Sequence, residues 1–259
     1  MPPLEPVARL LTRLDDARRR LGPSALLAFD ADGTLWEGDI GHDSFHALLG
    51  ARAVREAARG PLADEARRHG LPDGGDGNDI ARALYEAYLA GRYPEDRACA
   101  MMAWVFAGFT HGECDAFARE AMARVGLERR MQGEIKPVLA WARAENVDLW
   151  IVSASPRAPV EAAARVVGLD PYKVIAATPA EDSDGTLLPH VLDPMPYDEG
   201  KAECLRRAAP GVPVLAAFGN GSFDAPMLWL AALPVAVRPT PGLVERLAST
   251  PGAVVLEPA

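Results

Sequence analysis

ALLAFDADGTLW, residues 25–36 of the 259-residue chain, is a short apolar run that ends in two closely spaced aspartates. The run at 25–29 follows the turn-forming GPS at 22–24, and its unbroken apolar character is typical of a strand buried on both faces. Asp30 and Asp32 come directly after it. The segment therefore predicts a buried strand with acidic side chains at its carboxyl end.

Strands and helices alternate in the second half of the chain. We predict strands at 147–152, 174–177, 212–218, 233–237 and 253–257, and helices at 158–167 and 199–208. This alternation predicts an α/β fold, a Rossmann-like parallel sheet core flanked by helices, with ligands bound at the carboxyl ends of the strands. Ser153 and Asn220 follow two of these strands, so we expect both near Asp30 and Asp32.

Two other stretches have helical periodicity. Residues 3–21 form an Arg-rich amphipathic pattern, and residues 42–134 are rich in Ala and Arg. The longer stretch is broken at GP (60–61), LPDGGDGND (71–79) and GRYP (91–94). We therefore expect an inserted α-helical domain at 38–134 and a core domain formed by 1–37 and 135–259.

Some residues of the insert suggest a metal or cofactor site, but their context favours simpler interpretations. GDGND at 75–79 follows no apolar strand, which predicts a solvated loop. His42 and His46 lie four residues apart without the H-E-x-x-H pattern, which favours a surface or hinge position. The aromatic side chains are expected to pack inside the insert, and some of them to line a pocket: Tyr85, Tyr88, Trp104, Phe106, Phe109 and Phe117.

Composition restricts the partners. A net charge of −9 and a pI near 5.1 argue against nucleic acid, because clustered Lys and Arg are needed to hold a phosphate backbone. No stretch reaches the roughly 18 apolar residues of a membrane span, and the N-terminus does not resemble a signal peptide. Cys99, Cys114 and Cys204 have no C-x-x-C spacing, which favours reduced thiols. We expect a cytoplasmic protein with a small-molecule partner and no nucleic acid or membrane partner.

Four segments, in this order, resemble the motifs of the haloacid dehalogenase superfamily of phosphatases, closest to its phosphoserine-phosphatase-like branch. They are FDADGTLW (29–36), WIVSAS (150–155), EGKAE (199–203) and FGNGSFDAPML (218–228). That branch carries a helical cap between its first and second motifs, where the insert lies here. The resemblance implies a Mg²⁺-dependent phosphatase that hydrolyses a small phosphomonoester through an aspartyl-phosphate.

The resemblance also implies a role for each motif residue. Asp30 would attack phosphorus, and Asp32 would protonate the leaving oxygen and later take a proton from water. Ser153 and the amide of Ala154 would bind phosphoryl oxygens, and Lys201 would neutralise phosphate charge and hold the nucleophile. The implied magnesium ligands, with the last close by or in the second shell, are the Asp30 carboxylate, the Asp32 carbonyl, the Asn220 side chain and Asp224.

The sequence departs from the family pattern at one ligand and leaves alternatives open. The commonest pattern has Asp where this chain has Asn220, so we expect weaker magnesium affinity. A non-catalytic phosphate-binding relative is one alternative. A phosphotransferase or mutase, in which a closed cap excludes water from the aspartyl-phosphate, is another.

Substrate contacts are expected from the cap, since it closes over the core in this superfamily. Trp36 and Glu37 directly follow the nucleophile turn, where an acidic residue can pair with a substrate ammonium group. Arg82, Arg92 and Arg97 are candidates for a substrate carboxylate, although each is also an ordinary residue of an exposed helix. The favoured substrates are phosphoserine, phosphocholine and phosphoethanolamine.

Overall fold

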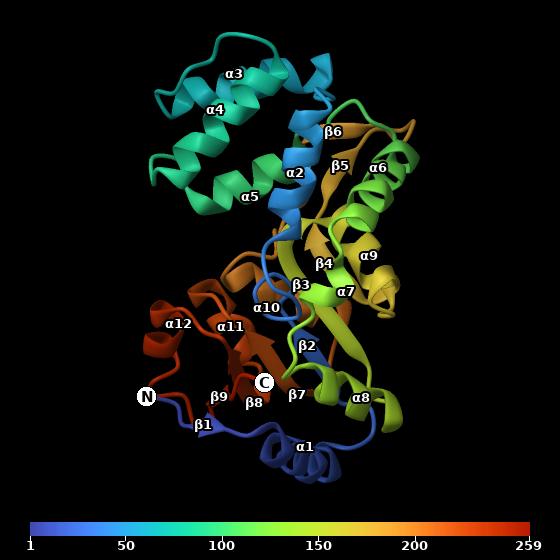
Figure 1. The fold of residues 1–259 in the computed structure, drawn as a ribbon, viewed down its shortest axis with the longest axis vertical. Helices are drawn as coiled ribbons and strands as arrows, with labels where there is room; N and C mark the ends of the chain where they lie inside the picture. The colour runs from blue at the N-terminus through green and yellow to red at the C-terminus, as the bar shows by residue number, and fades with distance from the viewer.

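The computed structural model describes residues 1–259, and a seven-stranded parallel sheet forms its lower half in Figure 1. The strand order is β1-β9-β8-β7-β2-β3-β4. The strands are β1 (Leu4–Glu5), β2 (Leu26–Phe29), β3 (Leu149–Pro156), β4 (Val174–Ala177), β7 (Val214–Gly219), β8 (Ala231–Val237) and β9 (Val254–Leu256). The predicted α/β fold with a parallel sheet is confirmed, and β2 lies between β3 and β7.

Helices cover both faces of the sheet, because β2 is apolar on both sides. Leu27 and Phe29 pack with α1, α6, α8 and α9, whereas Leu26 and Ala28 pack with α10, α11 and α12. The bounds are α1 (Val7–Leu21), α6 (His111–Arg124), α7 (Leu127–Arg130), α8 (Lys136–Ala144), α9 (Arg157–Val166), α10 (Glu199–Ala208), α11 (Ala225–Leu228) and α12 (Pro241–Arg246). Short 3₁₀ turns lie at Pro171–Lys173 and Ser222–Asp224.

A separate helical body lies above the carboxyl edge of the sheet (Figure 1). It contains α2 (Ile40–Gly50), α3 (Glu56–Arg68), α4 (Gly77–Leu89) and α5 (Glu95–Trp104). These helices bury their apolar faces against one another in a second hydrophobic core. The chain enters this body after Trp36, which bridges to Met131, and the Glu37 amide donates to the Arg130 carbonyl at 2.8 Å.

A hairpin that the sequence analysis did not predict joins this helical body from the core side. Its strands are β5 (Pro179–Glu181) and β6 (Leu187–Val191), paired antiparallel. Leu187 is buried in the core of the helical body, and its amide donates to the Phe109 carbonyl at 2.8 Å. The core of the helical body is therefore completed by the hairpin at 179–191, which follows WIVSAS (150–155) in the sequence.

Three local predictions differ from the structure. The first helix begins at Val7, because residues 4–5 pair with β9 as an edge strand. Pro61 does not end a helix but lies inside α3, where burial of one face of the helix outweighs the missing amide. Asp76 is not simply a loop residue, since its side chain caps α4 in a reciprocal capping box with Asp79.

Candidate active site

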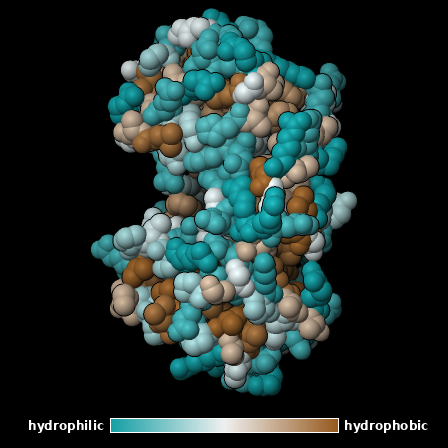
Figure 2. Space-filling view, in the orientation of Figure 1, coloured by the Kyte–Doolittle hydropathy of each residue, from teal (hydrophilic) through white to brown (hydrophobic).

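A cleft of about 340 Å³ lies between the carboxyl edge of the sheet and the helical body. Figure 2 shows the surface narrowed between the two lobes, at the height where α2 leaves the core in Figure 1. The predicted residues Asp30, Asp32, Ser153, Ala154 and Asn220 all line this cleft. They converge because β2, β3 and β7 are adjacent parallel strands whose carboxyl ends meet at one edge.

Asp30 lies at the end of β2 and is only 4% exposed. One carboxylate oxygen accepts a hydrogen bond from Lys201 Nζ at 2.7 Å, and the other accepts one from Thr34 Oγ1 at 2.8 Å. Burial raises the pKa of Asp30, and the neighbouring Lys201 opposes that shift. Asp30 is thus held in one orientation at the floor of the cleft.

Asp32 is anchored by a different set of donors. Its Oδ1 accepts from Trp36 Nε1 at 2.8 Å and from the Ile40 amide at 2.9 Å, and its Oδ2 accepts from Ser155 Oγ at 2.6 Å. Burial, with the nearby charge of Asp39, raises the pKa of Asp32 to about 7. A carboxyl with that pKa is suited to donating and accepting a proton near neutral pH.

Gly33, directly after Asp32, lets the chain turn sharply at the edge of the cleft. Its φ is +77°, and a Cβ there would lie 2.0 Å from Asn220 Nδ2. Only glycine adopts this conformation readily, and only a residue without a side chain leaves room for Asn220. The D-x-D-G pattern therefore has a steric cause as well as a chemical one.

Lys201 is fully buried beneath Asp30 and donates hydrogen bonds to the carboxylates of Asp30 and Asp224. Burial alone lowers the pKa of Lys201, but the adjacent carboxylates of Asp224 and Asp30 outweigh it and raise the pKa. Asp224, also fully buried, accepts from the amides of Asn220 and Gly221 at 2.9 and 2.8 Å. Burial raises the pKa of Asp224 to about 6. Lys201 is therefore a charged group that holds Asp30 in place from beneath the cleft.

Ser153 and Ala154 lie on β3, which continues past residue 152, where the prediction ended it, to Pro156. Pairing with β4 is irregular between Val152 and Pro156, so this stretch is turned out of the regular ladder. Ser153 Oγ accepts from the Ser155 amide at 3.1 Å, which leaves its hydroxyl proton for a ligand. Both residues border the cleft, as an anion-binding role requires.

The donor set at this edge fits a hard divalent cation. The Asp30 carboxylate and the Asn220 amide border the cleft with Asp32, and oxygen ligands of these kinds suit Mg²⁺. The carboxylates of Asp30, Asp32 and Asp224 outnumber Lys201, so a cation would offset uncompensated negative charge. No three side chains of His, Cys, Asp or Glu are arranged as a metal site. Such an ion would therefore also need carbonyl, amide or water oxygens.

The residues expected to contact substrate are not brought into the cleft. Trp36 is fully buried and donates a hydrogen bond to Asp32, whereas Glu37 is exposed to solvent. Arg97 forms an ion pair with Glu65, with Arg97 Nη2 at 2.6 Å from Glu65 Oε2. The exposed Arg82 and Arg92 do not line the cleft either. The structure places none of these arginines in the cleft, because a helix surface offers several faces and local periodicity does not say which face meets the core.

Other residues also line the cleft, and among them only Tyr88 belongs to the aromatic set expected from the sequence to line a pocket. From the helical body come Asp39, His42, Tyr88, Glu95, Cys99 and Met102, and from the core come Ser155, Phe223 and Thr240. Ser155 was within the quoted WIVSAS motif, and Asp39 within the stretch after the nucleophile. Glu95 has no distinguishing local pattern, so only the packing of α5 identifies it.

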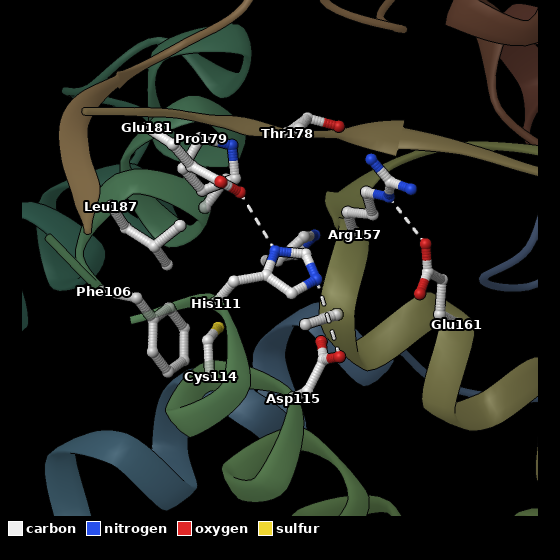
Figure 3. Close-up of a pocket in the computed structure, with 13 residues that line it drawn as sticks. Phe106, His111, Cys114, Asp115, Arg157, Glu161, Thr178, Pro179, Glu181 and Leu187 are labelled. Carbon is white, nitrogen blue, oxygen red and sulfur yellow. Dashed lines mark hydrogen bonds and ion pairs between the residues drawn. The ribbon is translucent and has the colours of Figure 1, made fainter. Parts of the chain in front are cut away.

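A second cavity, of about 30 Å³, lies where α6, α9 and the β5–β6 hairpin meet (Figure 3). His111 lies between Glu181, at 3.0 Å from Nδ1, and Asp115, at 3.6 Å from Nε2. Arg157 pairs with Glu161 on the other wall, at 2.6 Å. The cavity has less than a tenth of the volume of the main cleft and contains none of the motif aspartates, so the main cleft is the candidate active site.

The chain is similar to known proteins over most of its length. A family model described as haloacid dehalogenase-like hydrolase matches residues 27–228. No curated protein sequence matches the chain. None of its helices has the length and apolar character needed to cross a bilayer.

Several solved structures share the fold. A protein of unknown function from Bordetella pertussis Tohama I is 24% identical with a TM-score of 0.66, over 90% of this chain and 98% of that one. A functionally unknown protein from Anaerococcus prevotii DSM 20548 is 14% identical with a TM-score of 0.70, over 96% and 91%. A substrate-bound phosphoserine phosphatase is 16% identical with a TM-score of 0.54, over 89% and 92%. At these identities the likeness is one of fold.

Proposed function

The chain belongs to the haloacid dehalogenase-like hydrolase family, and from this premise we propose that it is a magnesium-dependent phosphatase of small phosphomonoesters. The observation that carries the proposal is the pairing of Asp30 with buried Lys201 beside Asp32, at the floor of a cleft that Ser153 also lines. A phosphate monoester is anionic and has a poor leaving group. Its cleavage therefore needs a placed nucleophile, a proton donor and positive charge together.

In the first step, a carboxylate oxygen of Asp30 forms a bond to phosphorus while the bond from phosphorus to the ester oxygen breaks. Asp32 gives its proton to the departing oxygen, which leaves as an alcohol. In the second step, a water oxygen attacks phosphorus, Asp32 takes the proton back, and the bond to Asp30 breaks to release phosphate. Ser153 and the Ala154 amide hold the phosphoryl oxygens throughout, while Lys201 holds Asp30 in place from beneath the cleft.

Magnesium would be held by the Asp30 carboxylate, the Asp32 carbonyl and the Asn220 side chain, with Asp224 behind them. When bound, the ion supplies positive charge that shields the phosphoryl group from the anionic nucleophile. The Asp224 side chain supports this arrangement by accepting a hydrogen bond from the main-chain amide of Asn220. This bond orients the loop that carries the Asn220 side chain.

The environment of Asp32 favours phosphate esters over organic halides as substrates. Three donors hold this side chain, and its pKa is raised to about 7, as expected for a group that must protonate an alkoxide. A halide leaves without a proton, so a dehalogenase has no need of an acid here. The proton donor is therefore the feature that separates the two reactions.

Replacing Asp30 by Asn tests the proposal. We expect Asp30→Asn to reduce phosphate release from p-nitrophenyl phosphate by about a thousandfold or more, because an amide cannot take up phosphorus. Phosphate release is measured with Mg²⁺ and with EDTA, which should abolish it. Asp184→Asn, the same substitution in the exposed turn of the β5–β6 hairpin, is the control. Full activity in Asp30→Asn would refute the nucleophile assignment.

The same assay separates hydrolysis from the alternatives. Transfer of phosphate to an added acceptor alcohol in place of water would indicate a phosphotransferase. Phosphate binding without any turnover in the presence of Mg²⁺ would indicate a non-catalytic relative. Release of inorganic phosphate, insensitive to the acceptor, is the outcome we expect.

A further inference from the structure

The wall of the cleft that faces the nucleophile is acidic and aromatic. α4 contributes Tyr88, and α5 contributes Glu95, Cys99 and Met102, while Phe223 adds a ring from the core side. No arginine lines the cleft, and no lysine side chain reaches its surface, since Lys201 is fully buried and committed to Asp30 and Asp224. Any part of a substrate beyond its phosphate therefore meets carboxylates and rings.

Glu95 and Asp39 are the two carboxylates that the helical body contributes to the cleft, and neither has a permanent cationic partner. Glu95 is exposed at the start of α5 and forms no ion pair, whereas Arg97, two residues on, is paired with Glu65 away from the cleft. Asp39 has only His42, whose Nε2 lies 3.6 Å from Oδ2. Burial lowers the pKa of His42, so this histidine is mostly neutral at pH 7 and leaves the charge of Asp39 uncompensated.

The ring of Tyr88, which lines the cleft from the helical body, is placed to add to a field that attracts cations. Phe223 is already engaged, because it stacks on Tyr197 with centroids 5.2 Å apart and Lys201 Nζ lies 5.1 Å from its ring centroid. Glu95 lines the same cleft as Tyr88 and Phe223. Burial raises the pKa of Tyr197, and the nearby Glu95 carboxylate raises it further. The face of an aromatic ring is electronegative and binds ammonium groups, most strongly where a carboxylate is nearby.

Resting on the proposed phosphatase function, we propose that Glu95 and Tyr88 form a subsite that selects phosphomonoesters whose alcohol carries an ammonium group and no carboxylate. The substrate class is then the phosphate esters of amino alcohols, with a primary or quaternary ammonium. A carboxylate at the same place finds no arginine or lysine side chain and meets Glu95 and Asp39. Phosphoserine is therefore disfavoured, although its ammonium group alone would fit.

Four esters of graded charge test this selection. Phosphoethanolamine and phosphocholine carry a cation, ethyl phosphate is their neutral counterpart, and phosphoserine adds a carboxylate. We expect kcat/KM for the better cationic ester to exceed that for ethyl phosphate and for phosphoserine by about tenfold each. Comparison of the two cationic esters then distinguishes a primary from a quaternary ammonium.

Variants of Glu95 assign the selection to this wall. Glu95→Gln should lower the ratio of kcat/KM between cationic and neutral esters by about fivefold, mainly through KM. Glu95→Lys should reverse the order of phosphoethanolamine and phosphoserine. Glu86→Gln, the same substitution at an exposed residue of α4 outside the cleft, should leave the ratio unchanged.

The outcomes separate this inference from the function on which it rests. Equal rates with ethyl phosphate and the cationic esters, a preference for phosphoserine, or a charge selectivity that survives Glu95→Gln would overturn the subsite while leaving the phosphatase intact. Failure to release phosphate from any of these esters and from p-nitrophenyl phosphate would overturn both.

Discussion

At the residue scale, the cleft depends on side chains that hold other side chains in place. Ser155 does not need to touch a substrate to matter, because its hydroxyl donates to Asp32 Oδ2 at 2.6 Å. Trp36 and the Ile40 amide hold the other oxygen of Asp32. The Asp32 carboxyl is thereby held in one orientation at the cleft by donors from Trp36, Ile40 and Ser155.

Ser155→Ala should impair proton donation more than nucleophilic attack. We expect kcat/KM to fall by about tenfold for an alkyl phosphate, whose leaving oxygen needs a proton, and by much less for p-nitrophenyl phosphate, whose phenolate leaves readily. Ser24→Ala, at an exposed turn, is the matched control. An equal loss with both substrates would contradict a role for Ser155 in positioning Asp32.

Asn220→Asp should strengthen magnesium binding. The substitution adds a negative charge to a ligand at the cleft edge, and carboxylates bind Mg²⁺ more tightly than amides. The main-chain bond from residue 220 to Asp224 does not depend on the side chain, so the loop should be retained. We expect the Mg²⁺ concentration for half-maximal activity to fall by about threefold to tenfold. An unchanged concentration would argue against ligation by residue 220.

At the element scale, Arg97 ties α5 to α3 instead of facing a substrate. Its guanidinium forms two hydrogen bonds with Glu65, at 2.9 and 2.6 Å, and the Tyr93 hydroxyl donates to the same carboxylate at 3.0 Å. Glu65 is only 1% exposed. Burial alone raises the pKa of Glu65, but the bonds from Arg97 and Tyr93 outweigh it and lower the pKa to about 2. The position of α5, and hence of Glu95, depends on this cluster.

Arg97→Ala should therefore destabilise the protein in a pH-dependent way. Because the pKa of Glu65 is lower folded than unfolded, its contribution is complete above about pH 4.5 and is lost as the pH falls toward 2. We expect a loss of about 2 kcal/mol in urea unfolding at pH 7, since Arg68 remains near Glu65, and a smaller loss at pH 3. Arg82→Ala, at an exposed arginine of α4, should change stability by less than about 0.5 kcal/mol. Equal losses at both pH values would contradict the assignment to Glu65.

At the scale of the whole molecule, the cleft is formed by two hydrophobic cores that meet at the sheet edge. The core of the helical body includes Leu187 from the β5–β6 hairpin, while α6 contributes Ala118, Ala121 and Met122 to the core of the sheet and Cys114 to that of the helical body. The division at 38–134 therefore describes the chain order better than the packing. In the proposed reaction, the phosphate would bind at the sheet edge and the alcohol part of the substrate beside the helical body.

Ligand binding in this cleft should stabilise the folded protein as a whole. A ligand that binds only the native state at 100 times its dissociation constant adds about 2.7 kcal/mol to the free energy of unfolding. We expect Mg²⁺ with fluoroberyllate, a phosphoryl mimic, to raise Tm relative to EDTA, and Asp30→Asn to remove most of this rise. Asp184→Asn should keep it. The same Tm with and without the ligands would contradict a metal and phosphate site between the two bodies.

The sequence by itself determined the parallel sheet and the convergence of Asp30, Asp32, Ser153 and Asn220. These features follow from short-range signals: apolar runs form the strands, polar residues follow them, and adjacent parallel strands bring their ends to one edge. The strand at 174–177 and the helix at 199–208 were predicted with the bounds that the structure has.

Only the tertiary structure decided which side chains lie across the cleft from Asp30 and Asp32. Which side of α5 meets the cleft depends on how its apolar face packs against helices distant in sequence, so Glu95 lines the cleft whereas Arg97 is held by Glu65. The partners of Lys201 are likewise distant in the chain. Helical periodicity identifies a helix, but its rotation about its own axis is set by the burial of surface between elements, which no local stretch of sequence contains.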